Sequence, residues 1–429
     1  MDKISYQFTN CGKLGNKGPS QTDADNSYRG TTLEGKVKVS TGAQKWKVPV
    51  SGLYRIEAYG AQGGRHGWGQ RAGGYGAKIQ GEFTLNAGEE ISVIVGQMGG
   101  DSKSSGDTDN AGPGGGGGSF VFRNVMDRYP LIAAGGGGGA SRNGSMDANS
   151  TENGKSGEGK SNGGSGGNGG RENTGGSSYW SGGGAGWLTN GTGGNMSTNY
   201  DANKGSNNQG EGGICPRYGG NGGSRGNDGN YEGGDGGFGG GGGGTDDNGG
   251  TGGGGGYSGG GGACSSPTNG RGGGGGSYNS GANQVNTAMG RAGHGLVIIT
   301  EISTNEPPTS PSFIKQPILN SISLSGESVL LEWNPSTDKE SDAISYEVEF
   351  FDGSSWRVLV SDINVNSYSA IIPTTVTNKA QFRIRAGDIE GGKSEYTIGN
   401  VFSITTKLAL IQDDGVVLAY KDGVWKAIQ

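Results

Sequence analysis

Cysteine, histidine and proline are scarce in this chain of 429 residues, and each shortage excludes a class of protein. Three cysteines cannot hold a disulfide scaffold, and two histidines leave little for metal or acid–base chemistry. The 12 prolines are too few for a collagen triple helix, whose strict glycine spacing is also missing. The composition favours a structural or binding protein over an enzyme, and we expect no cofactor and no metal.

Long apolar runs and an excess of positive charge are also missing. No run approaches the ~20 residues of a membrane-spanning helix, so we expect no membrane insertion. Residues 1–302 carry 24 basic and 24 acidic side chains, and the remainder carries 10 and 16, which gives a net charge of −6. A nucleic-acid partner requires a basic surface, so we expect none.

The first residues, from Met1 to Phe8, contain no apolar stretch of the kind found in a secretory leader. We therefore expect synthesis in a cytosol, where thiols stay reduced. Cys11, Cys215 and Cys264 are then free thiols. The alternative is a bridge between Cys215 and Cys264.

Glycine is abundant, with 100 residues, of which 92 lie in residues 1–302. Over residues 135–295 it forms runs and Gly-Gly-X repeats, for example at 163–170. A polyproline-II helix has three residues per turn and no internal hydrogen bonds, so each X projects on one edge. The two bare edges can exchange N–H···O=C bonds with neighbouring segments. We expect a polyglycine-II bundle over about 135–295; the alternative is a flexible glycine linker.

Aromatic residues interrupt the glycine runs, which is rare in linkers. They are Tyr179, Trp180, Trp187, Tyr218, Tyr231, Phe238, Tyr257 and Tyr278. Most are expected to clamp the rim of the bundle. Loops on a rigid scaffold often carry recognition, and aromatic rings are favoured anchors that also stack on sugars. The candidate ligand-binding residues are Tyr179, Trp180, Trp187, Tyr200 and Tyr231, with packing alone as their alternative role and a cell-surface glycan as the expected ligand.

Short segments outside the long glycine runs predict about seven β-strands. Apolar and polar residues alternate in three of them, and the others are short and apolar. The segments are 44–50, 52–60, 77–85, 91–96, 119–123, 129–134 and 296–302. No amphipathic helix is evident. We expect an all-β chain whose residues 1–302 form a jelly-roll-like sandwich, with its first and last strands bracketing the inserted bundle.

Several motifs in residues 5–302 resemble a known family. They include Phe8-Thr-Asn-Cys-Gly, Gly18-Pro-Ser-Gln, Gly52-Leu-Tyr-Arg-Ile-Glu-Ala-Tyr-Gly and Pro130-Leu-Ile-Ala-Ala followed by glycines. In this order they resemble the glycine-rich extracellular region of the anaplastic lymphoma kinase and leukocyte tyrosine kinase receptors. The resemblance implies a jelly-roll-like sandwich that carries a polyglycine-II bundle. Ala24 stands where that family has a cysteine, so the implied disulfide cannot form, and we do not expect a receptor kinase.

Residues 312–406, after a linker at 303–311, resemble a fibronectin type III domain. Leu330-Leu-Glu-Trp333 resembles its strand B, and Phe382-Arg-Ile-Arg-Ala386 resembles its strand F. The loop Asp338-Lys-Glu-Ser-Asp342 resembles acidic loops of bacterial modules. It is expected to be a solvated loop, with a calcium site as the alternative.

Residues 407–429 contain two Asp-Gly pairs, at 414–415 and 422–423, between apolar runs. Asp-Gly is a strong hairpin signal, so we predict a three-stranded meander. Three strands this short are marginally stable alone, so the meander is expected to dock on another part of the protein.

No catalytic motif emerges from the sequence. Gly-x-Gly-x-x-Gly occurs many times, but never between a strand and a helix, so a dinucleotide site is not predicted. His66 and His294 are expected to be ordinary polar loop residues. A hidden pair of glycosidase carboxylates remains a minor alternative.

These expectations combine into a non-enzymatic adhesin or structural component of a phage or phage-tail-like particle. It would be a tail fibre, a tip or a baseplate-associated receptor-binding protein that recognises a bacterial cell surface, since polyglycine sandwiches also occur in tail-fibre adhesins of T-even-like phages. The alternatives are a bacterial extracellular adhesin or matrix protein and a surface-glycan depolymerase.

The expected partners follow from this reading. They are other tail or baseplate proteins, a bacterial surface glycan or protein receptor, and further copies of the chain in a trimer. The expected location is the virion or tail-like particle, which is assembled in the host cytoplasm and acts extracellularly.

Overall fold

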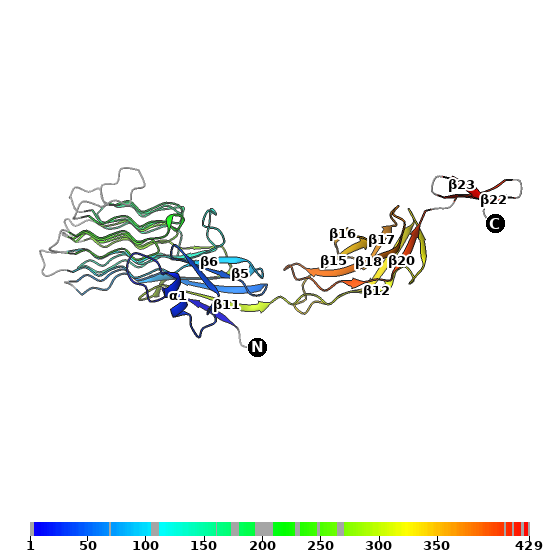
Figure 1. The fold of residues 1–429 in the computed structure, drawn as a ribbon. Coiled ribbons are helices and arrows are strands. Elements are labelled where there is room, and N and C mark those ends of the chain that lie inside the picture. Colours follow the sequence, from blue (N-terminus) through cyan, green and yellow to red (C-terminus); the bar gives the residue numbers. More distant parts are fainter. Residues whose placement is uncertain are drawn as a thin grey trace. The chain divides into compact units, whose positions relative to one another are not determined.

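The protein is seen in a computed structural model, and its chain divides into two compact units, Met1–Ser303 and Thr304–Gln429 (Figure 1). The described residues are 4–67, 70–103, 111–159, 161–172, 180–193, 209–227, 232–246, 249–263, 270–406, 409–413, 416–421 and 424–427, with only the backbone described for 303–304 and from 409 onward. Most regular structure is β. None of the helices within these ranges is long and apolar enough to cross a membrane.

The first unit is built on two sheets. In the first sheet the strand order is β1 (Ser5–Phe8), β11 (Leu296–Thr304), β4 (Gly52–Tyr59), β5 (Gly76–Leu85) and β10 (Ala282–Arg291). In the second sheet it is β2 (Val37–Ser40), β3 (Ala43–Lys47), β6 (Glu90–Ile94), β7 (Ser119–Phe122), β8 (Ile132–Ala134) and β9 (Tyr278–Asn279).

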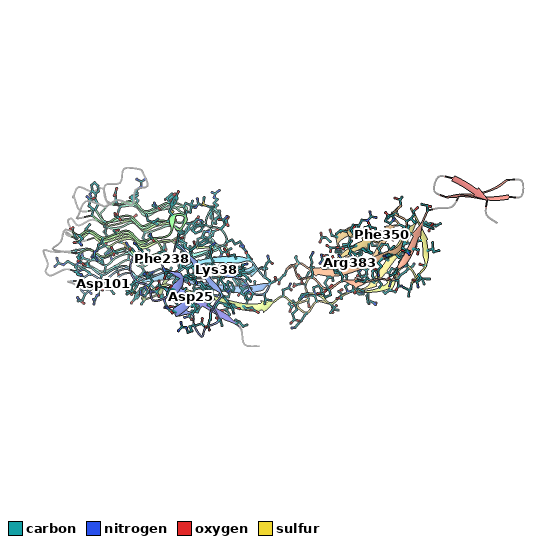
Figure 2. The ribbon with its side chains drawn as sticks, viewed as in Figure 1. Asp25, Lys38, Asp101, Phe238, Phe350 and Arg383 are labelled. Atoms are coloured by element: carbon teal, nitrogen blue, oxygen red, sulfur yellow. The ribbon has the colours of Figure 1, made fainter. Side chains whose placement is uncertain are left out.

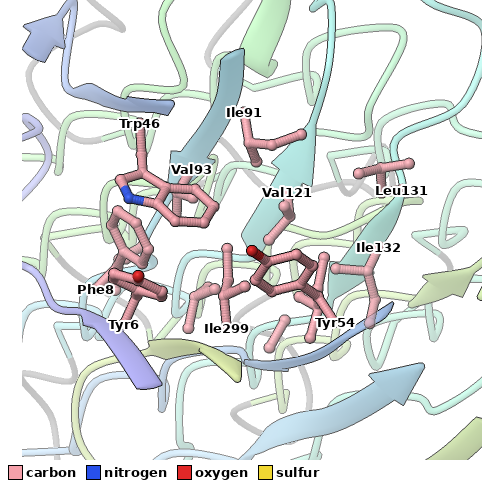
Figure 3. Packing of buried hydrophobic residues seen from close by; sticks show 14 of the residues in the cluster. Tyr6, Phe8, Trp46, Tyr54, Ile91, Val93, Val121, Leu131, Ile132 and Ile299 are labelled. Atoms are coloured by element: carbon pink, nitrogen blue, oxygen red, sulfur yellow. The ribbon is translucent and has the colours of Figure 1, made fainter. Parts of the chain in front are cut away.

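The core of the sandwich follows from the alternation of side chains along its strands. On β4 every second residue is buried, as expected when one face of a strand packs inward. Trp46 of β3 lies against Tyr6 of β1, with ring centroids 4.7 Å apart, and Tyr54 and Ile299 pack in the same cluster (Figure 3). These four residues come from both sheets, so the core joins the two layers.

In the described residues of the first unit all seven predicted strands are present, and four further strands were not predicted: β1, β2, β9 and β10. The strand β10 pairs with β5 and leaves most of its side chains exposed, so its sequence lacks the alternation that signals a strand. One short α-helix, α1 (Gln21–Ser27), was also missed. It begins with a capping box in which the Ser20 hydroxyl accepts from the Asp23 backbone N–H and the Asp23 carboxylate accepts from the Ser20 N–H.

Extended glycine segments are stacked beside the sandwich and bond to one another through the backbone. Along one antiparallel pair the bonds recur every third residue on both segments, at N···O distances of 2.8 to 2.9 Å. The donors at 112, 115 and 118 bond to carbonyls at 245, 242 and 239. Successive residues of one segment bond to different neighbours: Gly253 donates to Gly182, and Gly254 donates to Gly273.

Glycine is required in these segments because the backbones nearly touch. A Cβ atom added to Gly254 would lie 2.1 Å from the Gly136 carbonyl oxygen, and one added to Gly253 would lie 2.2 Å from the Gly260 oxygen. The glycine segments also differ from the predicted range of 135–295. They include residues before 135, such as 112–118, and they end before Tyr278, because β9 and β10 follow.

The glycine segments are attached to the outer face of the second sheet by aromatic side chains. In β7, Val121 belongs to the sandwich core, whereas Phe120 and Phe122 on the opposite face pack with Trp187 and Phe238. Phe238, which lies within a glycine run, is fully buried (Figure 2). The second sheet is therefore covered on both faces, which explains why every residue of β7 is buried.

The second unit contains an immunoglobulin-like β-sandwich. One sheet has the order β12 (Ser312–Lys315), β14 (Ser328–Asn334) and β17 (Ser367–Ile371). The other has β13 (Ile322–Leu324), β20 (Phe402–Thr405), β18 (Thr377–Asp388), β15 (Ile344–Phe351) and β16 (Trp356–Ile363), with β19 (Thr397–Ile398) beside β18. Trp333 and Phe382 are each 1% exposed in the core between them, as predicted.

The predicted three-stranded meander is present at the end of the chain. It consists of β21 (Ala409–Asp413), β22 (Val416–Lys421) and β23 (Val424–Ala427), which pair antiparallel in sequence order. The two Asp-Gly pairs lie outside the described residues.

Candidate functional site

Two of the five residues predicted to bind a ligand can be located. Tyr179, Tyr200 and Tyr231 lie outside the described residues. Trp180 is half-buried, and its indole nitrogen is buried without a hydrogen-bond partner in the described part of the chain. The comparison of prediction and structure is therefore limited to Trp180 and Trp187.

Trp187 belongs to the core. Its side chain is fully buried, and its ring lies 5.9 Å from Phe120 and 5.2 Å from Phe122 between centroids. Its indole N–H donates to the Asp127 carbonyl oxygen at 2.9 Å. A ring with no exposed face cannot contact a ligand, so the expectation that Trp187 binds one is corrected: it fastens the glycine segments to the sheet.

The thiols that the structure describes are buried and unpaired. Cys11 and Cys215 are both free, and Cys264 lies outside the described residues. Burial raises the pKa of Cys11, and it raises the pKa of Cys215 to about 11. Neither thiol is therefore ionised near neutral pH, and neither has the character of a reactive cysteine.

A surface pocket forms where the glycine segments meet the second sheet. Its volume is about 270 Å³, at the small end of ligand sites. It is lined by Arg128, Tyr129, Glu152, Gly166, Leu188, Tyr257 and Tyr278. These residues come from the turn between β7 and β8, from glycine segments and from β9, so the pocket exists only when the segments are docked on the sheet.

Three tyrosine rings form one wall of this pocket, which we call the tyrosine pocket. The Tyr129 and Tyr278 rings are stacked with centroids 5.3 Å apart, and those of Tyr257 and Tyr278 are 4.7 Å apart. The interplanar angles among the three rings are 10°, 27° and 29°. Tyr257 is 2% exposed, whereas Tyr129 is 44% exposed. Rings with nearly parallel planes and centroids this close overlap face to face, so the three tyrosines form an offset stack that reaches solvent at Tyr129.

One cationic and one anionic side chain complete the lining. The Arg128 guanidinium lies 5.3 Å from the centre of the Tyr129 ring, a cation–π contact. Burial, together with the negative charge of Glu152, raises the pKa of Tyr257 to about 12, and burial raises that of Tyr278. The phenols of both residues therefore stay neutral at physiological pH and can donate and accept hydrogen bonds.

Sequence analysis named Tyr257 and Tyr278 as aromatic residues among the glycine runs but did not group them, and it did not consider Tyr129. The only available signal was the aromatic character of each residue, because the three are far apart in the sequence. Their meeting depends on which glycine segment lies on which strand.

Other places where chemistry was considered have structural roles. His66 is fully buried, so it is not the ordinary loop residue that was expected, and His294 Nδ1 accepts a hydrogen bond from the Met98 N–H at 3.1 Å. Asp338 Oδ1 accepts from the backbone N–H groups of Glu340 and Asp342, which shapes their loop. In the described residues no group of three or more acidic, cysteine or histidine side chains could hold a metal ion.

Comparison with known proteins shows that parts of this chain are similar to other proteins in sequence and in structure. One segment of the chain is similar in sequence to a receptor tyrosine kinase. Over 100 residues it is 36% identical to the leukocyte tyrosine kinase receptor of Mus musculus, a match that covers 23% of this chain and 11% of the receptor. Because the match spans about a tenth of the receptor, the activity of that protein does not carry over. No family model matches the chain.

The structural likeness is to the PKD domain of an M14-like peptidase from Thermoplasmatales archaeon SCGC AB-540-F20. It covers 24% of this chain and 98% of that domain, at 19% sequence identity and a TM-score of 0.19. A likeness this weak carries no argument about function.

Proposed function

We propose that the glycine segments are polyglycine-II helices in a bundle carried by a jelly-roll-like sandwich. The recurrence of backbone hydrogen bonds at every third residue supports a helix with three residues per turn. The close backbone approach at Gly253 and Gly254 supports it too, since a polyglycine-II bundle has no room for a Cβ atom at such positions.

We propose further that residues 312–406 are a fibronectin type III domain within the immunoglobulin-like class. The strand order supports this, with β12, β14 and β17 facing β20, β18, β15 and β16. The burial of Trp333 on β14 and Phe382 on β18 agrees with their predicted places on strands B and F.

For the whole chain we propose a non-enzymatic adhesin or structural component of a phage or phage-tail-like particle that recognises a bacterial cell surface. The observation that carries the proposal is the bundle of backbone-bonded glycine segments, which holds turns and the tyrosine pocket on a rigid support. The described thiols, Cys11 and Cys215, are free, so the part of the scaffold that the structure describes relies on backbone hydrogen bonds and not on disulfides. Such a scaffold suits a protein made in a cytosol and used outside the cell.

Two alternatives make different predictions. Glycosidases use a pair of carboxylates, whereas one carboxylate, that of Glu152, lines the tyrosine pocket among the described residues. A surface-glycan depolymerase would release sugar from purified cell-wall polysaccharide, and we expect no release. A bacterial adhesin or matrix protein would be encoded apart from tail genes, whereas we expect tail genes beside this one.

The proposal is tested by adsorption and by localisation. The purified, fluorescently labelled chain should bind saturably to cells of some strains in a bacterial panel, and gold-labelled antibodies should mark the tail or baseplate of particles. Light scattering measures whether the chain assembles as the expected trimer. Labelling of bacterial surfaces in cultures without particles would contradict the proposal in favour of the bacterial adhesin.

A further inference from the structure

We propose that the tyrosine pocket binds a neutral pyranose ring of a glycan, with the exposed ring of Tyr129 as the stacking surface and Arg128 and Glu152 as hydroxyl partners. This inference deepens the proposed function, because it names a site and a ligand class. It rests on that function only for the source of the glycan, a bacterial cell surface.

The arrangement of the three rings favours a flat ligand. A quaternary ammonium group binds inside an aromatic cage, where ring faces converge on it from several directions. Here the ring planes lie within 29° of one another, so their faces do not converge. The negative face of an aromatic ring attracts the slightly positive C–H groups on the apolar face of a pyranose. The exposed ring of Tyr129, which is stacked on Tyr278, offers a single flat aromatic face that matches the shape of that sugar face.

The polar groups around the rings suit a ligand that carries hydroxyls. The structure gives the Glu152 carboxylate and the phenols of Tyr129, Tyr257 and Tyr278 no hydrogen bond or ion pair with another described residue. Such groups are free to bond with a ligand, and the Tyr257 phenol is almost wholly shielded from solvent. A carboxylate accepts from paired sugar hydroxyls, and a guanidinium donates to hydroxyl and ring oxygens.

The charge of the lining points to a neutral sugar. Among the described residues, Arg128 and Glu152 are the charged ones that line the pocket, and their charges cancel. An acidic sugar would meet the Glu152 carboxylate, and an amino sugar would meet the Arg128 guanidinium. Arg128 is exposed, and its guanidinium makes no hydrogen bond or ion pair with another described residue, so it can turn from the Tyr129 ring to the ligand.

The pocket is also built before any ligand arrives. The Tyr257 N–H donates to the Gly276 carbonyl at 2.8 Å, and the Tyr257 carbonyl accepts from the Trp187 N–H at 2.8 Å. Tyr278 lies on β9, where it pairs with Ala133 of β8. Rings held in this way lose little conformational freedom when a ligand binds, which favours affinity.

The test uses the full chain on a printed array that holds bacterial polysaccharides in one set and mammalian glycans in another. We expect the wild type to bind neutral pyranose-containing bacterial polysaccharides. Tyr129→Ala should weaken that binding about tenfold or more, because it removes the exposed ring, and Tyr129→Phe should retain most of it. Glu152→Gln should weaken binding as well. Tyr75→Ala is the matched control, because Tyr75 is 37% exposed but does not line the pocket.

Each variant is first checked for an unchanged melting temperature, and Glu152→Gln keeps the test valid if the alanine variant is destabilised. Failure to bind any glycan on the array would overturn the inference, and so would wild-type binding by both Tyr129→Ala and Glu152→Gln. Binding to mammalian glycans alone would support the pocket as a glycan-binding site but would contradict the proposal that the glycan comes from a bacterial surface.

Adsorption to whole cells separates this inference from the proposed function. If Tyr129→Ala adsorbs to cells as the wild type does, the pocket is not the recognition site, although the adhesin function stands. If the wild type binds glycans through the pocket but adsorbs to no bacterium, the adhesin function fails and the pocket stands.

Discussion

Aromatic residues that lie between glycine runs act as core residues for segments that have no other large side chains. Trp187, Phe238 and Tyr257 are each at most 2% exposed. They pack against Phe120 and Phe122 on the outer face of the second sheet. At the scale of single residues, these few rings supply the apolar burial that ties the glycine segments to the sandwich.

Replacing Trp187 with alanine should therefore destabilise the first unit by about 3–5 kcal/mol, since it leaves a large cavity. The substitution also removes the hydrogen bond that the indole N–H donates to the Asp127 carbonyl oxygen. Thermal unfolding monitored by circular dichroism measures the effect. Trp180→Ala is the control, because Trp180 is half-buried and its indole N–H has no partner among the described residues. Equal losses from the two variants would contradict the roles assigned here.

At the scale of elements, the glycine segments differ from strands in how they use their hydrogen bonds. A strand bonds to neighbours on two sides within one sheet, whereas successive residues here bond to different segments around them. This arrangement satisfies the backbone groups of a buried segment without forming a sheet. It also places backbone atoms where side chains would otherwise lie.

Gly254→Ala should cost about 3 kcal/mol, because the added Cβ atom would lie 2.1 Å from the Gly136 carbonyl oxygen and the segments must move apart. Urea denaturation of the full chain measures the loss. Gly387→Ala serves as the control, since its Cβ atom would meet its nearest neighbour at 3.6 Å, an ordinary contact. Little change at both positions would show that the segments are not tightly packed.

Amide hydrogen exchange should find the glycine amides of residues 112–118 and 252–256 strongly protected in the isolated protein. Their N–H groups are bonded to neighbouring segments and buried, so exchange requires the bundle to open. A flexible linker would exchange at the rate of an unfolded chain. Mass spectrometry of peptides from these segments distinguishes the two.

One face of the β18–β15 sheet in the second unit carries a stacked arrangement of charges and rings. The Arg383 guanidinium lies 4.3 Å from the Trp356 ring centre and 3.9 Å from that of Tyr396. The Tyr396 hydroxyl donates to Glu347 at 2.6 Å, and Arg385 donates to the same carboxylate at 2.8 Å. These contacts fix neighbouring side chains on a face that is only partly covered.

The stability of the second unit should fall in acid partly through Glu347. Burial raises the pKa of this carboxyl, but the hydrogen bonds from Tyr396 and Arg385 lower it more, so the net pKa lies below its usual value. The charged form therefore stabilises the folded state above the unfolded pKa of about 4.3, and this contribution disappears as the pH falls below it. Glu347→Gln should lower the melting temperature at pH 7, and the difference from wild type should shrink toward pH 3. A constant difference across this range would contradict the assignment.

At the scale of the whole molecule, the two units have separate hydrophobic clusters. The core around Trp46 and the cluster around Phe238 belong to the first unit, and the core around Trp333 belongs to the second. Each unit therefore has the apolar burial that an independently folding domain requires.

A fragment of residues 1–303 and a fragment of residues 304–429 should each fold alone. Each should show a cooperative melting transition close to one of those seen in the full chain, because the clusters that stabilise them are not shared. Calorimetry of the fragments and the full chain tests this. A fragment without a transition would show that its unit depends on the other.

Local patterns in the sequence were sufficient to predict much of this protein. Alternation predicted strands such as β4 and β5, the Asp-Gly pairs predicted the terminal meander, and the resemblance of the motifs around Trp333 and Phe382 to a fibronectin type III domain implied a second sandwich. These signals are local because a strand or turn is specified by residues that are adjacent in the chain. The strand β10 and the helix α1 were missed because an exposed strand and a seven-residue helix leave little periodicity.

The sequence by itself determined that glycine segments with a three-residue period would need close neighbours, but only the tertiary structure decided which neighbours they have. The Gly115 N–H donates to the Gly242 carbonyl, and not to that of another glycine, because the fold of the first unit places these two segments side by side. One glycine run is chemically like the next, so no residue in it specifies a partner. For the same reason the sequence could not tell that Trp187 is buried while Tyr129 is exposed, or that Tyr129, Tyr257 and Tyr278 meet in one pocket.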